Sequence, residues 1–314
     1  MAVHTVTIPR PAPATLPLRT VDIAELLTLD IPPRESFLAP WLTAQSLSMV
    51  YAWRGTGKTL AALAIAYAVA SGGSCFGWTA PKPRRVLYLD GELPCGELQA
   101  RAAAMAASED AQPEPGMLRF LTPDLQPHGM PNIASPQGQA ALEPLVAESD
   151  LIIVDSIVTL GRAGRENEAE SWQPVAQWAL EQRAAGRAVL FVHHSGKNGQ
   201  QRGTSSREDI LDAVLSLKRP NDYHEREGAR FLVQFEKARV LKGKDVEPFE
   251  ARLESGPDGR RVWTCKPVDI GRLEQVRELT ELGLSQREIA AELGIGLATA
   301  HRAVKAVKEA RSHD

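Results

Sequence analysis

Residues 47–59 read LSMVYAWRGTGKT, an apolar run followed by a glycine-rich turn, and an alanine-rich stretch continues to residue 70. An apolar run without alternation is typical of a strand covered on both faces. A glycine-rich turn between a strand and a helix exposes backbone N–H groups at a helix N-terminus, where phosphate groups bind. The stretch therefore predicts a strand, a phosphate-binding loop, and a helix that begins at Lys58.

In such a loop, Lys58 would reach the β- and γ-phosphates of ATP, and the Thr59 hydroxyl would bind Mg²⁺. The loop residues that would contact the phosphates are Gly55, Thr56 and Gly57. Ala52 stands where the usual motif has its first glycine, and alanine is small enough there if its φ stays negative. A glycine-rich turn formed by chance is the alternative, and the strand before it and the helix after it argue against that.

The alternation of short apolar runs and helical stretches continues to about residue 210. The apolar runs are 47–51, 86–90, 118–121, 151–155 and 188–193, and the helical stretches are 58–70, 97–107, 137–148 and 170–185. This alternation predicts an α/β fold with a mainly parallel sheet wrapped by helices. The later strand-like runs 211–218, 230–238, 248–254 and 261–264 have no helices between them and predict an antiparallel extension of the same sheet.

Length and composition limit the remaining possibilities. We expect an N-terminal arm at 1–40, a nucleotide-binding domain at 41–265 and a small helical domain at 271–312. The net charge of −3 excludes a surface that is basic throughout, so any nucleic-acid site has to be local. The three cysteines fit neither a disulfide framework nor a zinc site. With no signal core and no long apolar segment, we expect a cytoplasmic protein without a membrane partner.

Polar residues follow three of the apolar runs. Asp155 ends the run 151–155, and because central strands present their carboxyl ends at the ligand crevice, it would hold Mg²⁺ through water. Glu92 follows the run 86–90 and could accept a proton from an attacking water; Asp90 is the second candidate, and a solvated loop pair is the alternative. His193 and His194 could sense the γ-phosphate, with a structural role as the alternative.

Taken in order, these elements resemble a known family. The motifs AWRGTGKT, VLYLDGELP, MPNI, LIIVDS, VLFVHHSGK and RGTSS, spread over about residues 46 to 240, resemble the RecA/DnaB-like P-loop ATPases, specifically the plasmid RepA-type hexameric helicases. The resemblance implies a ring of six RecA-like subunits with ATP between neighbours. It also implies catalysis by Glu92 on magnesium-bound ATP, and single-stranded DNA in the central channel.

The run 230–238 bears on this ring. Lys237 and Arg239 point the same way because side chains alternate along a strand. The DnaB-like families carry a similar pair that reaches the γ-phosphate of the neighbouring subunit, where an arginine stabilises transition-state charge. Arg202 is a second candidate for this role, and a basic strand end that faces solvent is the alternative. A residue offered to the next subunit makes a head-to-tail interface, which closes as a ring or continues as a filament.

Two segments are candidates for DNA binding. The glycine-rich segment 195–207 resembles in position the channel loop of RecA-like motors, and a flexible surface loop is the alternative. Its basic residues, which could contact phosphates, are Lys197, Arg202 and Arg207. At the C-terminus we expect helices at 273–282 and 286–293 and a third from residue 297, with a capping box formed by Ser285 and Glu288.

The sequence LSQREIAAELGIGLATAHRAVKAV resembles the helix-turn-helix of resolvases and regulators, and it is an addition to the RepA pattern. Its expected core is Leu284, Ile289, Leu293, Leu297, Ala300 and Val304. The residues expected to face duplex DNA are Thr299, His301, Arg302 and Lys305. A protein-docking or oligomerisation role for this unit is the alternative.

These interpretations lead to one main hypothesis: an ATP-hydrolysing DNA motor in the replication of a plasmid or other mobile element. An ATP-controlled, DNA-binding regulator that does not unwind DNA is the main alternative. A recombination mediator that acts on filaments is a third.

Overall fold

The computed structural model describes residues 19–162, 169–195, 208–220 and 222–311, and the chain divides into a small unit, residues 1–33, and a larger one, residues 34–314. In the small unit, the helix α1 (Ile23–Thr28) is capped by Asp22, whose carboxylate accepts a hydrogen bond from the Glu25 amide at 2.8 Å. All of its residues are exposed, including the apolar side chain of Leu27. No helix in the described part of the chain is both long enough and apolar enough to cross a membrane.

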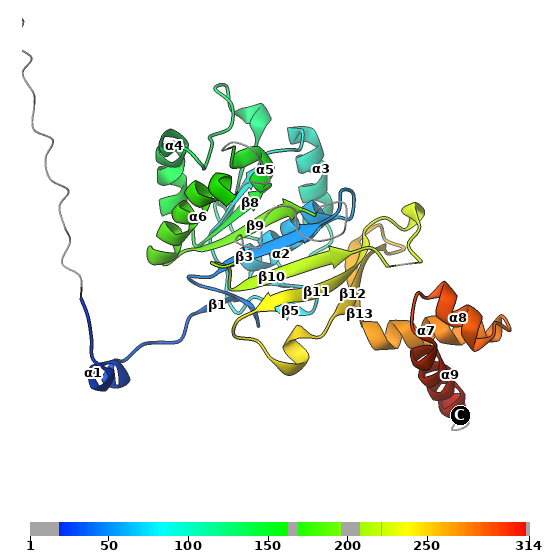
Figure 1. Ribbon diagram of the computed structural model, residues 1–314. Helices are drawn as coiled ribbons and strands as arrows, with labels where there is room; N and C mark the ends of the chain where they lie inside the picture. The colour runs from blue at the N-terminus through cyan, green and yellow to red at the C-terminus, as the bar shows by residue number, and fades with distance from the viewer. Residues whose placement is uncertain (1–18, 163–168, 196–207, 221, 312–314) are drawn as a thin grey trace, which may run out of the picture. The chain divides into compact units, whose positions relative to one another are not determined.

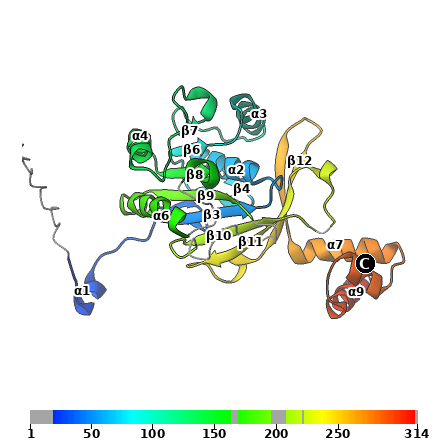
Figure 2. The ribbon, with the colours of Figure 1, turned by 45° about the horizontal axis from the view of Figure 1, so that its top comes forward.

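The larger unit is built on a nine-stranded sheet in the order β13-β12-β11-β10-β3-β9-β8-β6-β7. Most of its strands are labelled in Figure 1, and β6 and β7 are labelled in Figure 2. The parallel strands are β3 (Leu47–Ala52), β6 (Val86–Asp90), β7 (Leu118–Leu121), β8 (Leu151–Asp155), β9 (Ala188–His194) and β10 (Ala213–Lys218). The antiparallel strands are β11 (Arg230–Ala238), β12 (Phe249–Ser255) and β13 (Arg261–Pro267). The predicted α/β fold with a mainly parallel sheet and an antiparallel extension is confirmed.

One strand was predicted in the wrong part of the sheet. The run 211–218 was expected to begin the antiparallel extension, but β10 pairs in parallel with β3, with Ala213 opposite Ser48. A parallel neighbour requires a crossover connection, because the chain must return to the edge at which it started. The interval between the end of β9 at His194 and the start of β10 at Ala213 is long enough for such a connection.

Helices lie on both sides of the sheet, as seen in Figures 1 and 2. They are α2 (Lys58–Ser71), α3 (Cys95–Ala106), α4 (Pro136–Ala147), the short α5 (Ile157–Leu160) and α6 (Ala169–Ala184). Alternate residues of the central strands belong to two different core clusters, with Val50 in one and Met49 in the other. Both faces of these strands are therefore buried, which explains why their apolar runs do not alternate.

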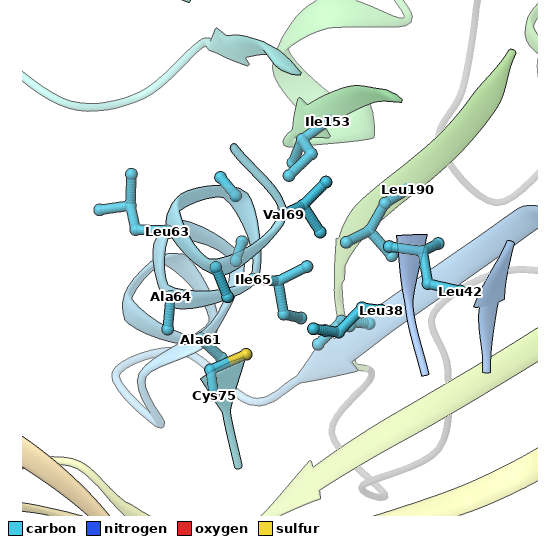
Figure 3. Packing of buried hydrophobic residues seen from close by; sticks show 14 of the residues in the cluster. Leu38, Leu42, Ala61, Leu63, Ala64, Ile65, Val69, Cys75, Ile153 and Leu190 are labelled. Carbon is cyan, nitrogen blue, oxygen red and sulfur yellow. The ribbon is translucent and has the colours of Figure 1, made fainter. Parts of the chain in front are cut away.

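The helix that follows the glycine-rich turn is the centre of the first core cluster. Ile65 and Val69 of α2 pack among Leu38, Leu190 and Ile153 (Figure 3). Leu38 belongs to the two-stranded sheet β1 (Ser36–Leu38) and β2 (Leu42–Thr43). A second such sheet, β4 (Ser74–Cys75) and β5 (Trp78–Thr79), follows α2. Because α2 is buried along most of its length, its first residue is held in place directly after the glycine-rich turn.

Three helices follow β13: α7 (Val268–Glu281), α8 (Gln286–Glu292) and α9 (Leu297–Arg311), which are labelled in Figure 1. The Ser285–Glu288 capping box is present, with the Ser285 amide donating to Glu288 Oε2 at 2.7 Å. Ile289, Ala300 and Val304 are buried in a separate small core. Leu297, predicted as core, is 48% exposed because it is the first residue of α9, and Val276 of α7 is buried in this core.

The connection to these helices also differs from the expectation. Residues 266–270 were left between the two expected domains, but β13 runs to Pro267 and α7 begins at the next residue. Proline is well tolerated just before a helix because the first helical N–H groups have no partner within the helix.

Candidate nucleotide site

The carboxyl ends of four neighbouring strands, β3, β9, β8 and β6, meet at one edge of the sheet. In an open α/β sheet this edge is where ligands bind. A pocket of about 600 Å³ lies there. Its lining includes the predicted residues Gly55, Gly57, Lys58, Thr59, Glu92, Asp155 and His194, together with Arg54, Leu60, Arg101 and Val158. The structure therefore brings residues from five separate stretches of the sequence into one cavity.

The turn at the floor of this pocket depends on its glycines. Gly57 has a φ of +115°, and a Cβ atom there would lie 3.2 Å from the ring of Phe231, so a larger residue would be both strained and crowded. The Thr56 amide donates to the Trp53 carbonyl at 3.3 Å, and the Thr56 side chain is buried outside the pocket lining. Ala52 is the last residue of β3 and has no positive φ, so alanine fits at this position.

Lys58 begins α2, and its Nζ donates to the Trp53 carbonyl at 3.3 Å. Burial lowers the pKa of Lys58, while the nearby carboxylates of Asp155 and Glu92 favour its charged form. The side chain is thus folded back over its own turn, within the pocket that a phosphate chain would enter.

Asp155 is buried at the end of β8, and the Tyr88 hydroxyl donates to its Oδ2 atom at 2.7 Å. Burial raises the pKa of Asp155 to about 6, and hydrogen bonds from Tyr88 and Thr59 oppose this rise. A buried carboxylate that is costly to ionise and lies beside a threonine hydroxyl fits a Mg²⁺ ligand. Among the described residues no group of three or more His, Cys, Asp or Glu could form a metal cage, and Mg²⁺ commonly keeps water and phosphate ligands.

Glu92 is held by two neighbours. The Ser156 hydroxyl donates to Glu92 Oε1 at 2.5 Å, and His194 Nε2 lies 3.2 Å from the same oxygen. The hydrogen bond from His194 is the largest cause that lowers the pKa of Glu92 to about 2, against the opposing effect of burial. A carboxylate with so low a pKa is a weak base. To act as a general base, Glu92 would first have to lose the hydrogen bond from His194, which lowers its pKa the most.

Asp90, the second candidate for the general base, has a different environment. Its Oδ1 atom accepts hydrogen bonds from the amides of Glu92 at 3.1 Å and Leu93 at 3.2 Å. It is fully buried and does not line the pocket. These contacts fix the turn that carries Glu92.

The two histidines also differ. Successive side chains on a strand point to opposite faces, so β9 can direct only one of the pair into the pocket. His194 lines the pocket and contacts Glu92, whereas His193 is fully buried outside the pocket lining.

Several residues of this site were not predicted from the sequence. Arg101 of α3 lines the pocket, and its Nε donates to Glu97 Oε1 at 2.9 Å. Tyr88 and Ser156 bind the two carboxylates, and Arg219 Nη2 donates to the Gly55 carbonyl at 2.9 Å. The Glu97–Arg101 spacing of four residues was a visible helical signal. The Arg219 contact joins segments 164 residues apart and has no local signature.

Lys237 and Arg239 lie at the opposite edge of the sheet. Because β11 is antiparallel to β10, with Lys237 opposite Val214, its end is far from its own phosphate-binding turn. Lys237 Nζ contacts the Glu208 carbonyl, Arg239 Nε donates to the Leu211 carbonyl at 3.1 Å, and Arg239 Nη2 contacts the Asp209 carbonyl. Both basic side chains therefore hold the segment that leads into β10.

The remaining predicted sites concern DNA. Lys197, Arg202 and Arg207 lie outside the described residues. On α9, the side chains of His301, Arg302 and Lys305 are exposed and that of Thr299 is half-buried. These residues share the first turns of α9, next to the turn between α8 and α9.

The sheet, the glycine-rich turn and the strand-end carboxylates define a RecA-like P-loop ATPase core. Residues 12–200 match the family model of the AAA domain, and the chain belongs to this family. Among solved structures, a KaiC-like protein of Pyrococcus horikoshii is similar in fold, with 16% identity and a TM-score of 0.51 over 74% of this chain and 94% of that one. The flagellar accessory protein FlaH of Methanocaldococcus jannaschii is similar at 15% identity and a TM-score of 0.50, over 70% of this chain and 90% of that one. No curated protein matches the sequence.

Proposed function

We propose that this protein is an ATP-hydrolysing DNA motor of the RepA type, which assembles head to tail and acts on single-stranded DNA in the replication of a plasmid or other mobile element. The observation that carries the proposal is the division of charged residues between the two edges of the sheet. Lys58, Asp155 and Glu92 line one pocket, while Lys237 and Arg239 lie at the edge that cannot reach it within the same chain.

Within one subunit, the pocket residues have separate roles. Lys58 binds the β- and γ-phosphates, and Thr59 and Asp155 would hold Mg²⁺ beside them. Bound Mg²⁺ neutralises charge on the phosphates. Arg101 adds a positive charge on the α3 side of the same pocket.

Proton transfer is assigned to Glu92. When the γ-phosphate draws His194 towards itself, Glu92 loses the hydrogen bond that does most to lower its pKa, and its basicity rises. Glu92 then takes a proton from the attacking water. Nucleotide binding would in this way raise the basicity of the residue that activates the attacking water.

The neighbouring subunit completes the site. Lys237 and Arg239 would leave the carbonyls of residues 208–211 and reach the neighbour's γ-phosphate, with Arg202 as a further candidate. Lys237 and Arg239 hold the chain that directly follows the segment 195–207. Their movement would therefore be passed on to Lys197 and Arg207, the proposed contacts to single-stranded DNA. The assembly would be a hexameric ring or a filament.

A second candidate function is an ATP-controlled regulator that binds duplex DNA without unwinding it. The exposed face of α9, with His301, Arg302 and Lys305, favours this function because the residues lie together at the start of the third helix. A recombination mediator is the third candidate, and no contact among the described residues favours it over the other two.

The test is ATP hydrolysis by the full chain without DNA, with single-stranded DNA and with duplex DNA. Lys58→Ala should abolish turnover, and Lys82→Ala serves as a control, since Lys82 is exposed and pairs with Glu35 on the surface. Stimulation by single strands supports the motor and leads to an unwinding assay on a forked duplex. Turnover that responds only to duplex supports the regulator, and normal turnover by Lys58→Ala refutes both.

A further inference from the structure

The segment that follows β10 contacts the phosphate-binding turn directly. Arg219 is the first residue after this strand, and its Nη2 donates to the Gly55 carbonyl at 2.9 Å. A Cβ atom on Gly55 would lie 3.2 Å from this nitrogen, so the guanidinium packs closely on the turn. The same guanidinium lies over the Tyr223 ring, 4.5 Å from its centroid, in a cation–π contact.

Three residues further along, the same segment contacts the C-terminal helices. Asp222 Oδ2 accepts a hydrogen bond from Gln275 Nε2 of α7 at 2.7 Å and lies 3.1 Å from Arg230 Nη2. Arg230 is buried and also pairs with Glu227 at 3.2 Å and with Glu250 at 2.9 Å. Asp222 is therefore fixed on the sheet side, and Gln275 is its hydrogen-bond partner from α7.

A small cavity of about 130 Å³ lies at this junction. Arg219 and Asp222 line it from the sheet side, and Arg272, Gln275 and Leu293 line it from the helical side. Arg219 is thus shared between the junction and the nucleotide pocket, because it lines the first and binds the turn that forms the second.

We propose that Arg219, Asp222 and Tyr223 couple the nucleotide pocket to the attachment of α7, so that a bound nucleotide loosens the C-terminal helices. In the structure the guanidinium of Arg219 is paired with a carbonyl, which carries no net charge. A triphosphate in the turn brings several negative charges within a few ångströms, and these attract the guanidinium more strongly than a carbonyl does. Movement of Arg219 towards the phosphates removes it from Tyr223 and from the cavity that it lines together with Asp222 and Gln275. The hydrogen bond from Gln275 to Asp222 is thereby weakened.

The coupling rests on the proposed nucleotide site, and it gives ATP a way to change how the helical unit that carries α9 is held. Binding equilibria that are coupled act on each other equally. Loss of the Gln275 contact therefore strengthens nucleotide binding by the factor by which nucleotide weakens that contact. We expect at least about a threefold effect, slightly below the usual range of about 5–150-fold for such couplings.

The experiment follows amide hydrogen exchange in α7 and α8 of the full chain, with and without a non-hydrolysable ATP analogue and Mg²⁺. The wild type should exchange at least about threefold faster in α7 when the analogue is bound. Gln275→Ala should exchange fast without nucleotide and should respond little to it, while it keeps normal turnover at saturating ATP. Gln286→Ala is the matched control, because Gln286 lies in the same helical unit at the start of α8 and should respond as the wild type does.

A fluorescent ATP analogue, titrated into the same samples, separates the two ideas. If the analogue binds and exchange in α7 does not change, the coupling is wrong and the nucleotide site stands. A full response in Gln275→Ala would also refute the coupling, because the contact would then be irrelevant. If no analogue binds to the wild type, the proposed function fails and the coupling fails with it.

Discussion

The two edges of the large sheet differ in how their charged side chains are paired. At the edge where the parallel strands end, Lys58 is buried beside the carboxylates of Asp155 and Glu92, and Asp155 accepts a hydrogen bond from Tyr88. At the opposite edge, Lys237 is half-buried and Arg239 exposed, and the hydrogen bonds of both go to main-chain carbonyls. The first edge forms a charged pocket within one chain, whereas under the proposed function the second offers its cations to the phosphates of a neighbouring subunit.

This difference follows from topology. Parallel strands bring all their carboxyl ends to one edge, so residues from distant segments converge there without a partner chain. The antiparallel strand β11 runs the other way and carries its last residues to the far edge. A single chain can therefore bind nucleotide at one edge, but it needs a neighbour to bring the two edges together. Substitutions at each edge test this division.

The largest effect is expected at the far edge. Arg239→Ala should lower the ATP turnover of the assembled protein by at least about 10³-fold, the lower limit measured for an arginine supplied in trans. Arg252→Ala is the control, because Arg252 lies on the next strand and pairs with Glu254 at 3.7 Å. Steady-state hydrolysis at saturating ATP measures both variants.

A mixing experiment distinguishes a role in trans from a structural role. Lys58→Ala subunits retain Arg239, and Arg239→Ala subunits retain an intact pocket. In an equal mixture about a quarter of the interfaces combine an intact pocket with an intact arginine, so activity should return to about a quarter of the wild-type value. An inactive mixture that still assembles would show that Arg239 acts only within its own chain.

The next effect concerns the free energy that is lost when the buried carboxyl group of Asp155 ionises. The pKa of Asp155 in the folded protein is about 6, above its ordinary value of 3.8, so the native state binds this proton more tightly than the unfolded state does. Stability is therefore lost as the pH rises through this interval, and above pH 6 the loss amounts to about 3 kcal/mol. In EDTA and without nucleotide, Asp155→Asn should raise the free energy of unfolding by about this amount at pH 7.5.

Urea denaturation at two pH values tests this cost. At pH 5 the gain should fall to about half, because Asp155 is then largely protonated in the native state. Asp245→Asn is the control, since Asp245 is exposed, and it should leave stability nearly unchanged at both values. An equal gain for Asp155→Asn at pH 5 and pH 7.5 would contradict the assignment of the cost to ionisation.

Glu92→Gln should lower turnover by about 10²-fold while nucleotide binding is retained, because glutamine keeps the shape of the side chain but cannot accept the proton. Glu114→Gln, an exposed change outside the pocket, should be silent. Single-turnover hydrolysis and titration with a fluorescent ATP analogue measure the two quantities separately. Turnover within threefold of the wild type would show that Glu92 is not the general base and that its pocket residues only bind nucleotide.

The edge of the sheet that carries the nucleotide pocket could be predicted well, because its signals in the sequence are local. Each strand is an apolar run that ends in a polar residue, and parallel strands place such ends together, so Asp155 and Glu92 could be assigned to one pocket from their positions in the sequence. The same rule could not choose between His193 and His194, since the choice depends on which residue of β9 faces the pocket. It also could not predict that β10 is parallel, because the apolar run of a parallel strand looks like that of a buried antiparallel one.

Contacts between distant segments have no signal in the sequence. Tyr88 stands out there only as part of an apolar run, yet its hydroxyl binds Asp155 across to the neighbouring strand. Arg219 reaches Gly55 only because β10 is placed beside β3. Such contacts depend on strand order, which local patterns do not specify. Leu297 shows the converse, since its apolar side chain predicted a core position although its place at the start of α9 leaves it exposed.

The smallest effect is expected where the turn departs from the usual motif. Ala52 is a buried strand residue, paired with Leu217 on one side and His194 on the other, and it requires no positive φ. Ala52→Gly, which restores the usual glycine, should therefore bring no gain in turnover. It should lower the free energy of unfolding by about 0.5–1 kcal/mol, because glycine loses more conformational freedom in a strand than alanine does.

Urea denaturation and steady-state hydrolysis of the same Ala52→Gly preparation give both numbers. Ala61→Gly is a useful comparison, since Ala61 is buried within α2 and should lose stability by a similar or larger amount without affecting the turn. A tenfold rise in turnover for Ala52→Gly would mean that alanine restrains the turn. The phosphate-binding turn would then not have its active conformation in the wild type. An unchanged turnover with a small loss of stability would show that the strand, and not a glycine at this position, holds the start of the loop.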